Sequence, residues 1–215
     1  MKIKVANSEN SFDINKIFCI GRNYAKHAKE LGNAVPEKPV VFMKSKNAII
    51  TAGTKIKIPS HGNELHHEAE LVVLIGTGGK NIPESEAEKH IGGYGIGLDL
   101  TLRDVQAELK SKGLPWETAK AFDGSAPLGI FVQSVSEVTN LTIKCYVNDQ
   151  LRQDGKCGDM IYSVPFLISY LSSIFTLETG DLIFTGTPDG VGPLVSSDVI
   201  KVEISEIGEM SYEVE

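Results

Sequence analysis

The sequence has little of what marks several specialised classes of protein. Its three cysteines, Cys19, Cys145 and Cys157, are an odd number and lie far apart, so neither a disulfide framework nor a zinc ribbon is expected. The formal net charge is −7, and no basic block is present. A nucleic-acid partner is therefore not expected, because phosphate contacts need clustered Lys and Arg.

Long hydrophobic runs are also missing. No apolar stretch approaches the ~20 residues that a membrane-spanning helix needs, so we expect no membrane partner. Residues 1–14 show neither an apolar segment nor a small-residue cleavage site of the kind found in signal peptides. These features predict a cytoplasmic protein with reduced thiols.

The chain instead carries many short strand patterns and few helical ones. Its 215 residues, of which 41% are hydrophobic, are enough for one well-packed domain over 1–215. Strands and helices do not alternate regularly, which argues against a doubly wound parallel sheet. We predict an α+β, mainly β architecture, a roll or partly open barrel with a few short peripheral helices at 22–32, 83–93, 101–113 and 163–175.

Two glutamates stand at the start of the buried strand expected over 69–76. Glu68 and Glu70 are two residues apart, so on a strand their side chains point to the same face and repel each other. A divalent cation would remove this repulsion, and oxygen ligands suit Mg²⁺, Mn²⁺ or Ca²⁺. Asp99, the one charge of the apolar strand 94–100, is the third candidate ligand, because a buried carboxylate needs a partner.

Two alternatives to this metal site remain open. The glutamates could face solvent on an edge strand while Asp99 caps the helix that follows. A zinc site built from His61, His66 and His67 is less favoured, since adjacent strand residues point to opposite faces and no H-E-x-x-H motif is present.

Polar residues on two predicted helices suggest further site groups. His27 and Glu30 are three apart and share a helix face, an arrangement that orients an imidazole for activating water, although a solvated surface pair fits the spacing as well. Arg103 and Gln106 are also three apart, and a guanidinium could grip a substrate carboxylate. The alternative for Arg103 is an ordinary exposed side chain on an amphipathic helix.

Three further residues have weaker signals. Lys44 ends an apolar strand, and Lys120 lies in the segment WETAKAFDG. Thr187 belongs to the loop FTGTPDGVGP, which could bring its hydroxyl and backbone N–H groups to a ligand or could simply be a rigid turn. Composition does not separate these readings.

Six segments, taken in order, resemble the signature segments of the fumarylacetoacetate hydrolase family. The resemblance runs from about Ile17 to the C-terminal hairpin and is strongest to short, single-domain members of the acylpyruvase and oxaloacetate decarboxylase type. The segments are GRNYAKHAKELG, KPVVFMK, HHEAELVVLIG, GYGIGLDLTLRDVQ, GLPWETAKAFD and DLIFTGTPDGVGP.

The resemblance implies a fold, a metal and a set of roles. The fold would be the mixed β-sandwich roll of this family, and the protein a homodimer. Glu68, Glu70 and Asp99 would hold Mg²⁺ or Mn²⁺. His27 and Glu30 would form the catalytic dyad on a lid helix.

The remaining candidates would face the substrate. By the same resemblance, Lys120 would act in catalysis, and Arg103, Gln106, Thr187 and Lys44 would bind the small 2-keto acid substrate.

The activity implied first is hydrolysis of a carbon–carbon bond in 2,4-diketo acids of the acylpyruvate or fumarylpyruvate type, with decarboxylation of oxaloacetate as an accompanying reaction. A second enzyme reading is an isomerase, hydratase, decarboxylase or keto–enol tautomerase of unsaturated 2-keto dicarboxylates. A reading from another class is a Ca²⁺-binding β-sandwich module without catalysis.

Overall fold

The segment AELVVLI forms strand β7 (Ala69–Ile75) at the centre of a seven-stranded sheet in the computed structural model, which describes residues 1–30, 32 and 35–215. All seven residues of β7 are buried. Leu71 and Val73 join one hydrophobic core, and Val72 and Leu74 join a second core on the opposite face of the sheet. Burial on both faces explains why the segment is continuously apolar and does not alternate.

The seven-stranded sheet is mixed. Strands β3 and β13 are parallel, as are β5 and β10, while the other neighbours in this sheet are antiparallel. Its strands follow one another in the spatial order β4 (Val40–Lys44), β3 (Ile17–Gly21), β13 (Leu182–Phe184), β7, β8 (Ile91–Leu98), β10 (Ala126–Val132) and β5 (Ile49–Ile50).

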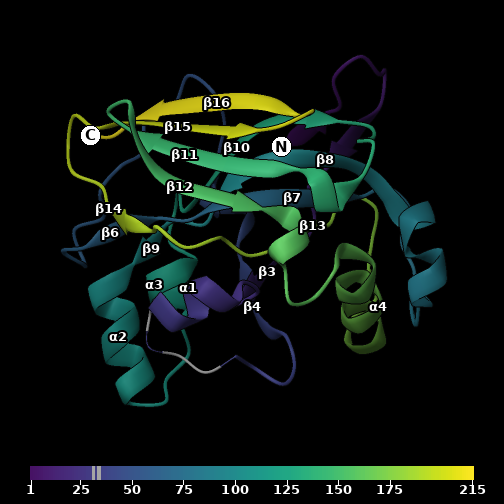
Figure 1. Cartoon of the computed structure of the whole chain (residues 1–215), viewed down its shortest axis with the longest axis horizontal. Helices are drawn as coiled ribbons and strands as arrows, with labels where there is room; N and C mark the ends of the chain where they lie inside the picture. The colour runs from purple at the N-terminus through teal and green to yellow at the C-terminus, as the bar shows by residue number, and fades with distance from the viewer. Residues whose placement is uncertain (31, 33–34) are drawn as a thin grey trace.

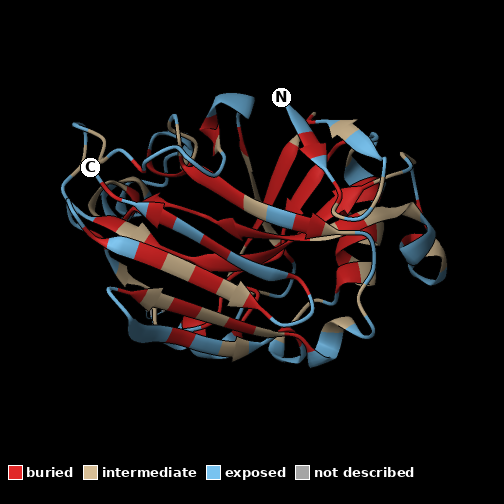
Figure 2. Ribbon diagram, turned by 90° about the horizontal axis from the view of Figure 1, so that it is seen from above, coloured by how far each residue is buried: buried red, intermediate tan, exposed pale blue. Residues whose placement is uncertain are grey.

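A four-stranded antiparallel sheet lies over the seven-stranded one (Figure 1). Buried and exposed residues alternate along its strands (Figure 2), as on β11, where Ile143, Cys145 and Val147 are buried. This period of two sends one face of the sheet into the first core, where it packs against the central sheet. The order of the strands is β12 (Gln150–Lys156), β11 (Thr142–Val147), β15 (Val199–Ile204) and β16 (Gly208–Glu213).

Short elements complete the described part of the chain. A three-stranded sheet has the order β14 (Gly192–Pro193), β6 (Leu65–His67) and β9 (Thr101–Leu102), and β1 (Lys2–Lys4) pairs with β2 (Ser11–Asp13). The α-helices are α1 (Ala25–Glu30), α2 (Arg103–Ser111), α3 (Glu117–Lys120) and α4 (Val164–Ile174). The 3₁₀ helices are η1 (Lys46–Ala48), η2 (Glu84–His90), η3 (Val138–Asn140) and η4 (Cys157–Asp159).

The predicted architecture is confirmed: strands dominate, helices are few and short, and the sheets form a curled sandwich roll. The hairpin turn expected at Asn148 and Asp149 is present, and both residues take the positive φ angles, 51° and 61°, that a tight turn between twisted strands requires. Helix α4 begins after Ser163, whose hydroxyl accepts the backbone N–H of Phe166 at 3.3 Å.

Two predicted elements differ in kind. The segment 54–59, expected as a strand, contains no named strand and pairs only through a single bridge between Ile56 and Val214. The helix expected over 83–93 is the 3₁₀ helix η2.

The start of α1 also differs from the prediction. The helix expected over 22–32 begins at Ala25, and the end of that range lies partly outside the described residues. Asn23, expected to cap the helix, is fully buried and reaches other elements instead. Its amide donates to the carbonyl oxygens of Tyr162 (3.0 Å) and Thr185 (2.8 Å) and accepts the backbone N–H of Tyr162 at 2.7 Å.

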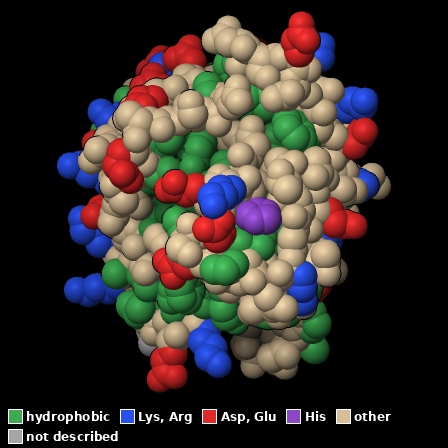
Figure 3. All heavy atoms as spheres, turned by 90° about the vertical axis from the view of Figure 1, so that its right-hand side faces the viewer, with side chains coloured by type: hydrophobic (Ala, Val, Ile, Leu, Met, Phe, Trp, Pro, Cys, Tyr) green, Lys and Arg blue, Asp and Glu red, His purple; other side chains and the backbone are tan. Residues whose placement is uncertain are grey.

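The surface at one end of the molecule has charges of mixed sign. Figure 3 views the side where η2 and α4 lie, and there Lys and Arg side chains are scattered among Asp and Glu around a hollow with hydrophobic side chains. In the described part of the chain, no helix has the length and apolar character to cross a membrane.

Replacing Asn23 with Ala should destabilise the fold by about 2–4 kcal/mol, because the three hydrogen bonds of its buried amide are lost. Urea denaturation followed by circular dichroism measures the change in the free energy of unfolding. Asn140→Ala, which alters an exposed side chain, is the matched control and should change stability by less than about 0.5 kcal/mol. Equal stabilities of the two variants would contradict the anchoring role of Asn23.

Candidate metal centre and active site

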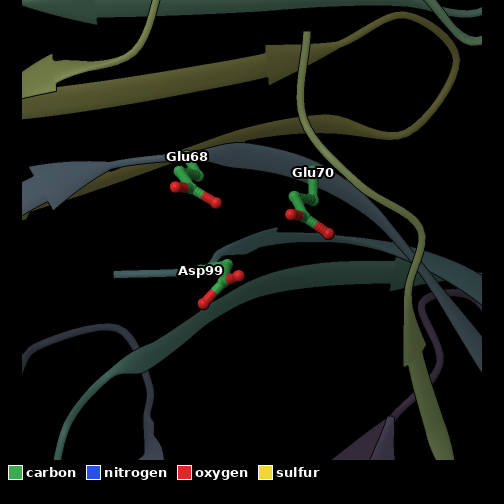
Figure 4. A group of neighbouring side chains, drawn as sticks. All are labelled: Glu68, Glu70 and Asp99. Carbon is green, nitrogen blue, oxygen red and sulfur yellow. The ribbon is translucent and has the colours of Figure 1, made fainter. Parts of the chain in front are cut away.

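Three buried carboxylates converge at one end of the central sheet (Figure 4), and we call Glu68, Glu70 and Asp99 the acidic triad. Glu68 lies between β6 and β7, Glu70 is on β7, and Asp99 directly follows β8. The antiparallel register that pairs Glu70 with Gly97 brings the ends of β7 and β8 together, and the backbone N–H of Asp99 donates to the carbonyl of Glu68 at 2.8 Å.

The geometry of the triad suits a metal ion. Each residue offers one carboxylate oxygen, and these oxygens lie within 4.8 Å of one another. The three side chains are at most 5% exposed, so they do not face solvent on an edge strand. Hard, buried oxygen donors in this number fit a divalent cation such as Mg²⁺ or Mn²⁺.

Three cationic side chains surround the triad. The Lys120 ammonium lies 2.8 Å from Glu68 and 2.7 Å from Asp99. The Lys44 ammonium lies 2.8 Å from the other oxygen of Asp99, and the Arg103 guanidinium pairs with Glu68 at 2.5 Å. These pairs offset the cost of burying the carboxylates.

Glu70 differs from the other two acids. Burial raises the pKa of Glu70 well above its usual range, and the charges of Asp99 and Glu68 raise it further. The backbone N–H of Gly186 donates to its carboxylate at 2.7 Å, but no Lys or Arg of the described residues forms an ion pair with it. A divalent cation would supply the positive charge that Glu70 lacks.

Glu68 stays ionised for the opposite reason. Burial alone would favour its neutral form, yet the charges of Lys120 and Arg103 outweigh burial and hold the pKa of Glu68 well below its usual range. His27 of helix α1 lines the same cavity as Glu68 and Glu70. The Lys120 pKa is raised because the charges of Asp99 and Glu68 overcome the effect of its burial.

The predicted dyad is formed in the structure. His27 on α1 is 4% exposed, and its Nδ1 lies 3.3 Å from a carboxylate oxygen of Glu30. A solvated surface pair does not describe this geometry, because the imidazole is buried. Glu30 also accepts the backbone N–H of Gly190 at 3.1 Å, which ties α1 to the loop after β13.

Thr187, a predicted substrate ligand, is part of a buried polar network. Its hydroxyl donates to the carbonyl of Ala69 at 2.8 Å and accepts the side-chain amide of Gln153 at 2.7 Å. The Gln153 carbonyl in turn lies 3.0 Å from Nδ1 of His67 and accepts the N–H of Ala69 at 3.1 Å. His67 is therefore directed toward Gln153 and not toward a carboxylate. The hydroxyl proton of Thr187 is already committed to β7, so toward a ligand this oxygen acts as an acceptor.

One cavity is lined by Glu68 and Glu70 of the triad, by His27 of the dyad and by residues of helix α2. Arg103 and Gln106 lie on the same face of α2, where the guanidinium donates to the Gln106 amide oxygen at 2.7 Å, and Lys110 follows one turn later. Lys44 does not line this cavity and instead forms an ion pair with Asp99. The lining residues are Ile20, Gly21, Arg22, His27, Phe42, Glu68, Glu70, Arg103, Gln106, Lys110, Trp116, Lys120 and Thr187.

Six of these residues were not singled out from the sequence, among them Arg22, Phe42, Lys110 and Trp116. The helical spacing that pointed to Gln106 also points to Lys110, which is seven residues after Arg103 and lies on the same helix face. Phe42 and Trp116 form an apolar wall, with ring centroids 5.9 Å apart. Arg22 directly follows β3, and nothing in its local pattern distinguishes it from a surface arginine.

Replacing Glu70 with Gln should stabilise the metal-free protein near pH 7 and abolish its response to metal. The pKa of Glu70 is raised in the folded state, so the protonated side chain contributes to stability. This contribution is complete at pH values below the pKa of the unfolded state, about 4.3, and is lost as the pH rises through the pKa of the folded state. The amide of the Glu70→Gln variant does not ionise, so the variant does not lose this stability as the pH rises.

Thermal melting from pH 5 to pH 8, with and without Mn²⁺, tests this. Mn²⁺ at 100 times its dissociation constant should stabilise the wild type by about 2.7 kcal/mol. The exposed Glu84→Gln variant should respond as the wild type does. Undiminished stabilisation of Glu70→Gln by Mn²⁺ would exclude Glu70 as a ligand.

Comparisons with known proteins agree with this geometry. The family model described as fumarylacetoacetate (FAA) hydrolase C-terminal matches residues 16–215. The oxaloacetate tautomerase YcgM of Escherichia coli is 48% identical over 194 residues, 89% of each chain. The fumarylpyruvate hydrolase of Pseudomonas aeruginosa, solved with Mn²⁺ and pyruvate, has a TM-score of 0.95 at 38% identity and covers 100% of this chain and 95% of its own. The 5-carboxymethyl-2-hydroxymuconate delta-isomerase of Mycobacterium smegmatis has a TM-score of 0.85 at 32% identity, over 96% and 85% of the two chains. The chain therefore belongs to the fumarylacetoacetate hydrolase family.

Proposed function

We propose that this protein is a divalent-metal-dependent enzyme that interconverts the keto and enol forms of oxaloacetate. The observation that carries the proposal is the buried imidazole of His27, oriented by Glu30 and lining the same cavity as Glu68, Glu70 and Lys120. The similarity to a relative named oxaloacetate tautomerase supports this reaction. A structural neighbour that holds Mn²⁺ and pyruvate, a 2-oxo acid, supports the class of substrate.

The acidic triad would hold the metal, Mg²⁺ or Mn²⁺. When bound, the ion supplies a positive charge that polarises the 2-oxo group of the substrate. Around it, Lys120 and Arg103 keep Glu68 ionised and ready to act as a ligand.

The side chains around the triad supply the proton transfer. Tautomerisation moves one proton from carbon C3 of oxaloacetate to the oxygen on C2. His27 in its neutral form takes the C3 proton, and Glu30 stabilises the imidazolium that results. The Lys120 ammonium stabilises the negative charge that develops on the C2 oxygen. The imidazolium then returns the proton to that oxygen, which yields the enol.

Hydrolysis of 2,4-diketo acids, the activity that the resemblance implied first, is the second candidate. The same dyad can deprotonate a water molecule that attacks the distal carbonyl, and Lys120 can stabilise the oxyanion. Its support is the close structural similarity to a fumarylpyruvate hydrolase. Decarboxylation of oxaloacetate needs no general base, so it depends less on the dyad.

Two other readings have less support. An isomerase acting on unsaturated 2-keto dicarboxylates is supported by a neighbour at a lower TM-score. A Ca²⁺-binding module would leave the buried His27 and its partner Glu30 without a role. The homodimer, the cytoplasmic location and the single domain over 1–215 stay predictions of the sequence.

Replacing His27 with Asn should lower kcat/KM for oxaloacetate tautomerisation by about 10²–10⁴-fold, the range typical of losing a general base. Metal-dependent decarboxylation of oxaloacetate should fall much less. The ultraviolet absorbance of the enol, followed with Mn²⁺ and then with a chelator, measures the first reaction, and pyruvate release measures the second.

His90→Asn, which removes a histidine outside the cavity, is the matched control and should leave both rates unchanged. Equal and negligible effects of His27→Asn on both reactions would discard the role of His27. The same variant assayed with an acylpyruvate tests the hydrolytic candidate, since a general base for water is equally essential there.

A further inference from the structure

The cavity contains more positive charge than the acidic triad requires. Lys44, Lys120 and Arg103 pair with Glu68 and Asp99, so three cations already stand against the three carboxylates of the triad. Two further cationic residues, Arg22 and Lys110, line the same cavity. A bound divalent ion would add to this excess, and a substrate with a single negative charge would not balance it.

Arg22 is held at the cavity in an unfavourable backbone conformation. It directly follows β3, its side chain is half-buried, and its φ of 60° lies in the left-handed region. This region is unfavourable for a residue with a Cβ atom, whereas glycine adopts it freely. Within residues 1–30, 32 and 35–215, no carboxylate forms an ion pair with Arg22. A positive charge is thus kept at the cavity although neither the backbone nor an acidic neighbour favours it.

Lys110 adds a second charge beside Arg22. It lies on the α2 face that also presents Arg103 and Gln106. Arg22, Arg103 and Lys110 all line the same cavity, so three positive charges face one space. An anion between them would relieve this repulsion.

The two ends of the cavity therefore differ in chemistry. Glu68, Glu70 and Lys120 are at most 5% exposed and form its inner end, whereas Arg22 is half-buried and Lys110 is exposed. The inner end suits the 2-oxo acid group of a substrate, on which the proposed function rests. The outer end suits a second anion on the same molecule, and a guanidinium binds a carboxylate through two hydrogen bonds.

We propose that Arg22 and Lys110 form a subsite for the distal carboxylate of the substrate, so that the enzyme selects 2-oxo dicarboxylates over 2-oxo monocarboxylates. Arg22 makes the directional contact, and Lys110 contributes charge. Phe42 and Trp116 supply an apolar wall of the same cavity, which suits the carbon chain of the substrate.

Calorimetric titration in the presence of Mn²⁺ tests this, with 2-oxoglutarate as the dicarboxylate and pyruvate as the monocarboxylate. Wild type should bind 2-oxoglutarate more tightly than pyruvate. Arg22→Gln should lower the ratio of the two affinities by roughly 10- to 100-fold, the effect of losing a hydrogen-bonded charge pair, and Lys110→Gln should lower it by a smaller factor. Lys112→Gln, at the exposed end of α2, is the matched control and should keep the wild-type ratio.

A second variant separates binding from folding. Arg22→Gly should melt at the wild-type temperature or above, because glycine relieves the left-handed conformation, yet it should lose discrimination as Arg22→Gln does. Equal losses for both ligands, or an unchanged ratio, would overturn the subsite while leaving the proposed function intact. A wild type that binds neither ligand with Mn²⁺ would instead overturn the proposed function, and the subsite with it.

Discussion

The mutual repulsion of three buried carboxylates is the constraint on which the rest of the site depends. Glu68, Glu70 and Asp99 are brought within 4.8 Å by the pairing of β7 with β8, where water cannot screen them. Lys44, Lys120 and Arg103 pair with Glu68 and Asp99, whereas no Lys or Arg of the described residues pairs with Glu70. Glu70 is therefore the carboxylate that a divalent ion would neutralise, in a triad that the fold has already assembled.

One loop connects the acidic triad to helix α1. Gly186 donates to Glu70, Thr187 donates to the backbone of β7, and Gly190 donates to Glu30. The segment that fixes a candidate ligand therefore also fixes the carboxylate that orients His27. Gln153 supports the loop from the opposite sheet through its bonds to Thr187 and Pro188, so both layers of the sandwich contribute to the position of the site.

Sequence patterns revealed the site residues whose relevant partners are close in the chain. They did not reveal those whose partners are distant in the chain. The i, i+2 spacing of Glu68 and Glu70 and the i, i+3 spacing of His27 and Glu30 are local, and both spacings place the side chains on one face as expected. The role of Gln153 depends on a partner 34 residues away in the chain, and its strand is mostly polar, so no local pattern marks it. Asn23 likewise resembled a helix cap, but its partners are up to 162 residues distant.

The sequence by itself determined the class of architecture, the family, and the residue types available for metal binding and proton transfer, because periodicity and motif order are properties of the chain. The tertiary structure decided which charges meet. It paired Lys44 with Asp99 outside the cavity lining, directed His67 to Gln153, and brought Arg22 and Lys110 to one cavity although they are far apart in the sequence. Electrostatic interactions act through space, so the balance of charge in the site exists only once the strands have paired.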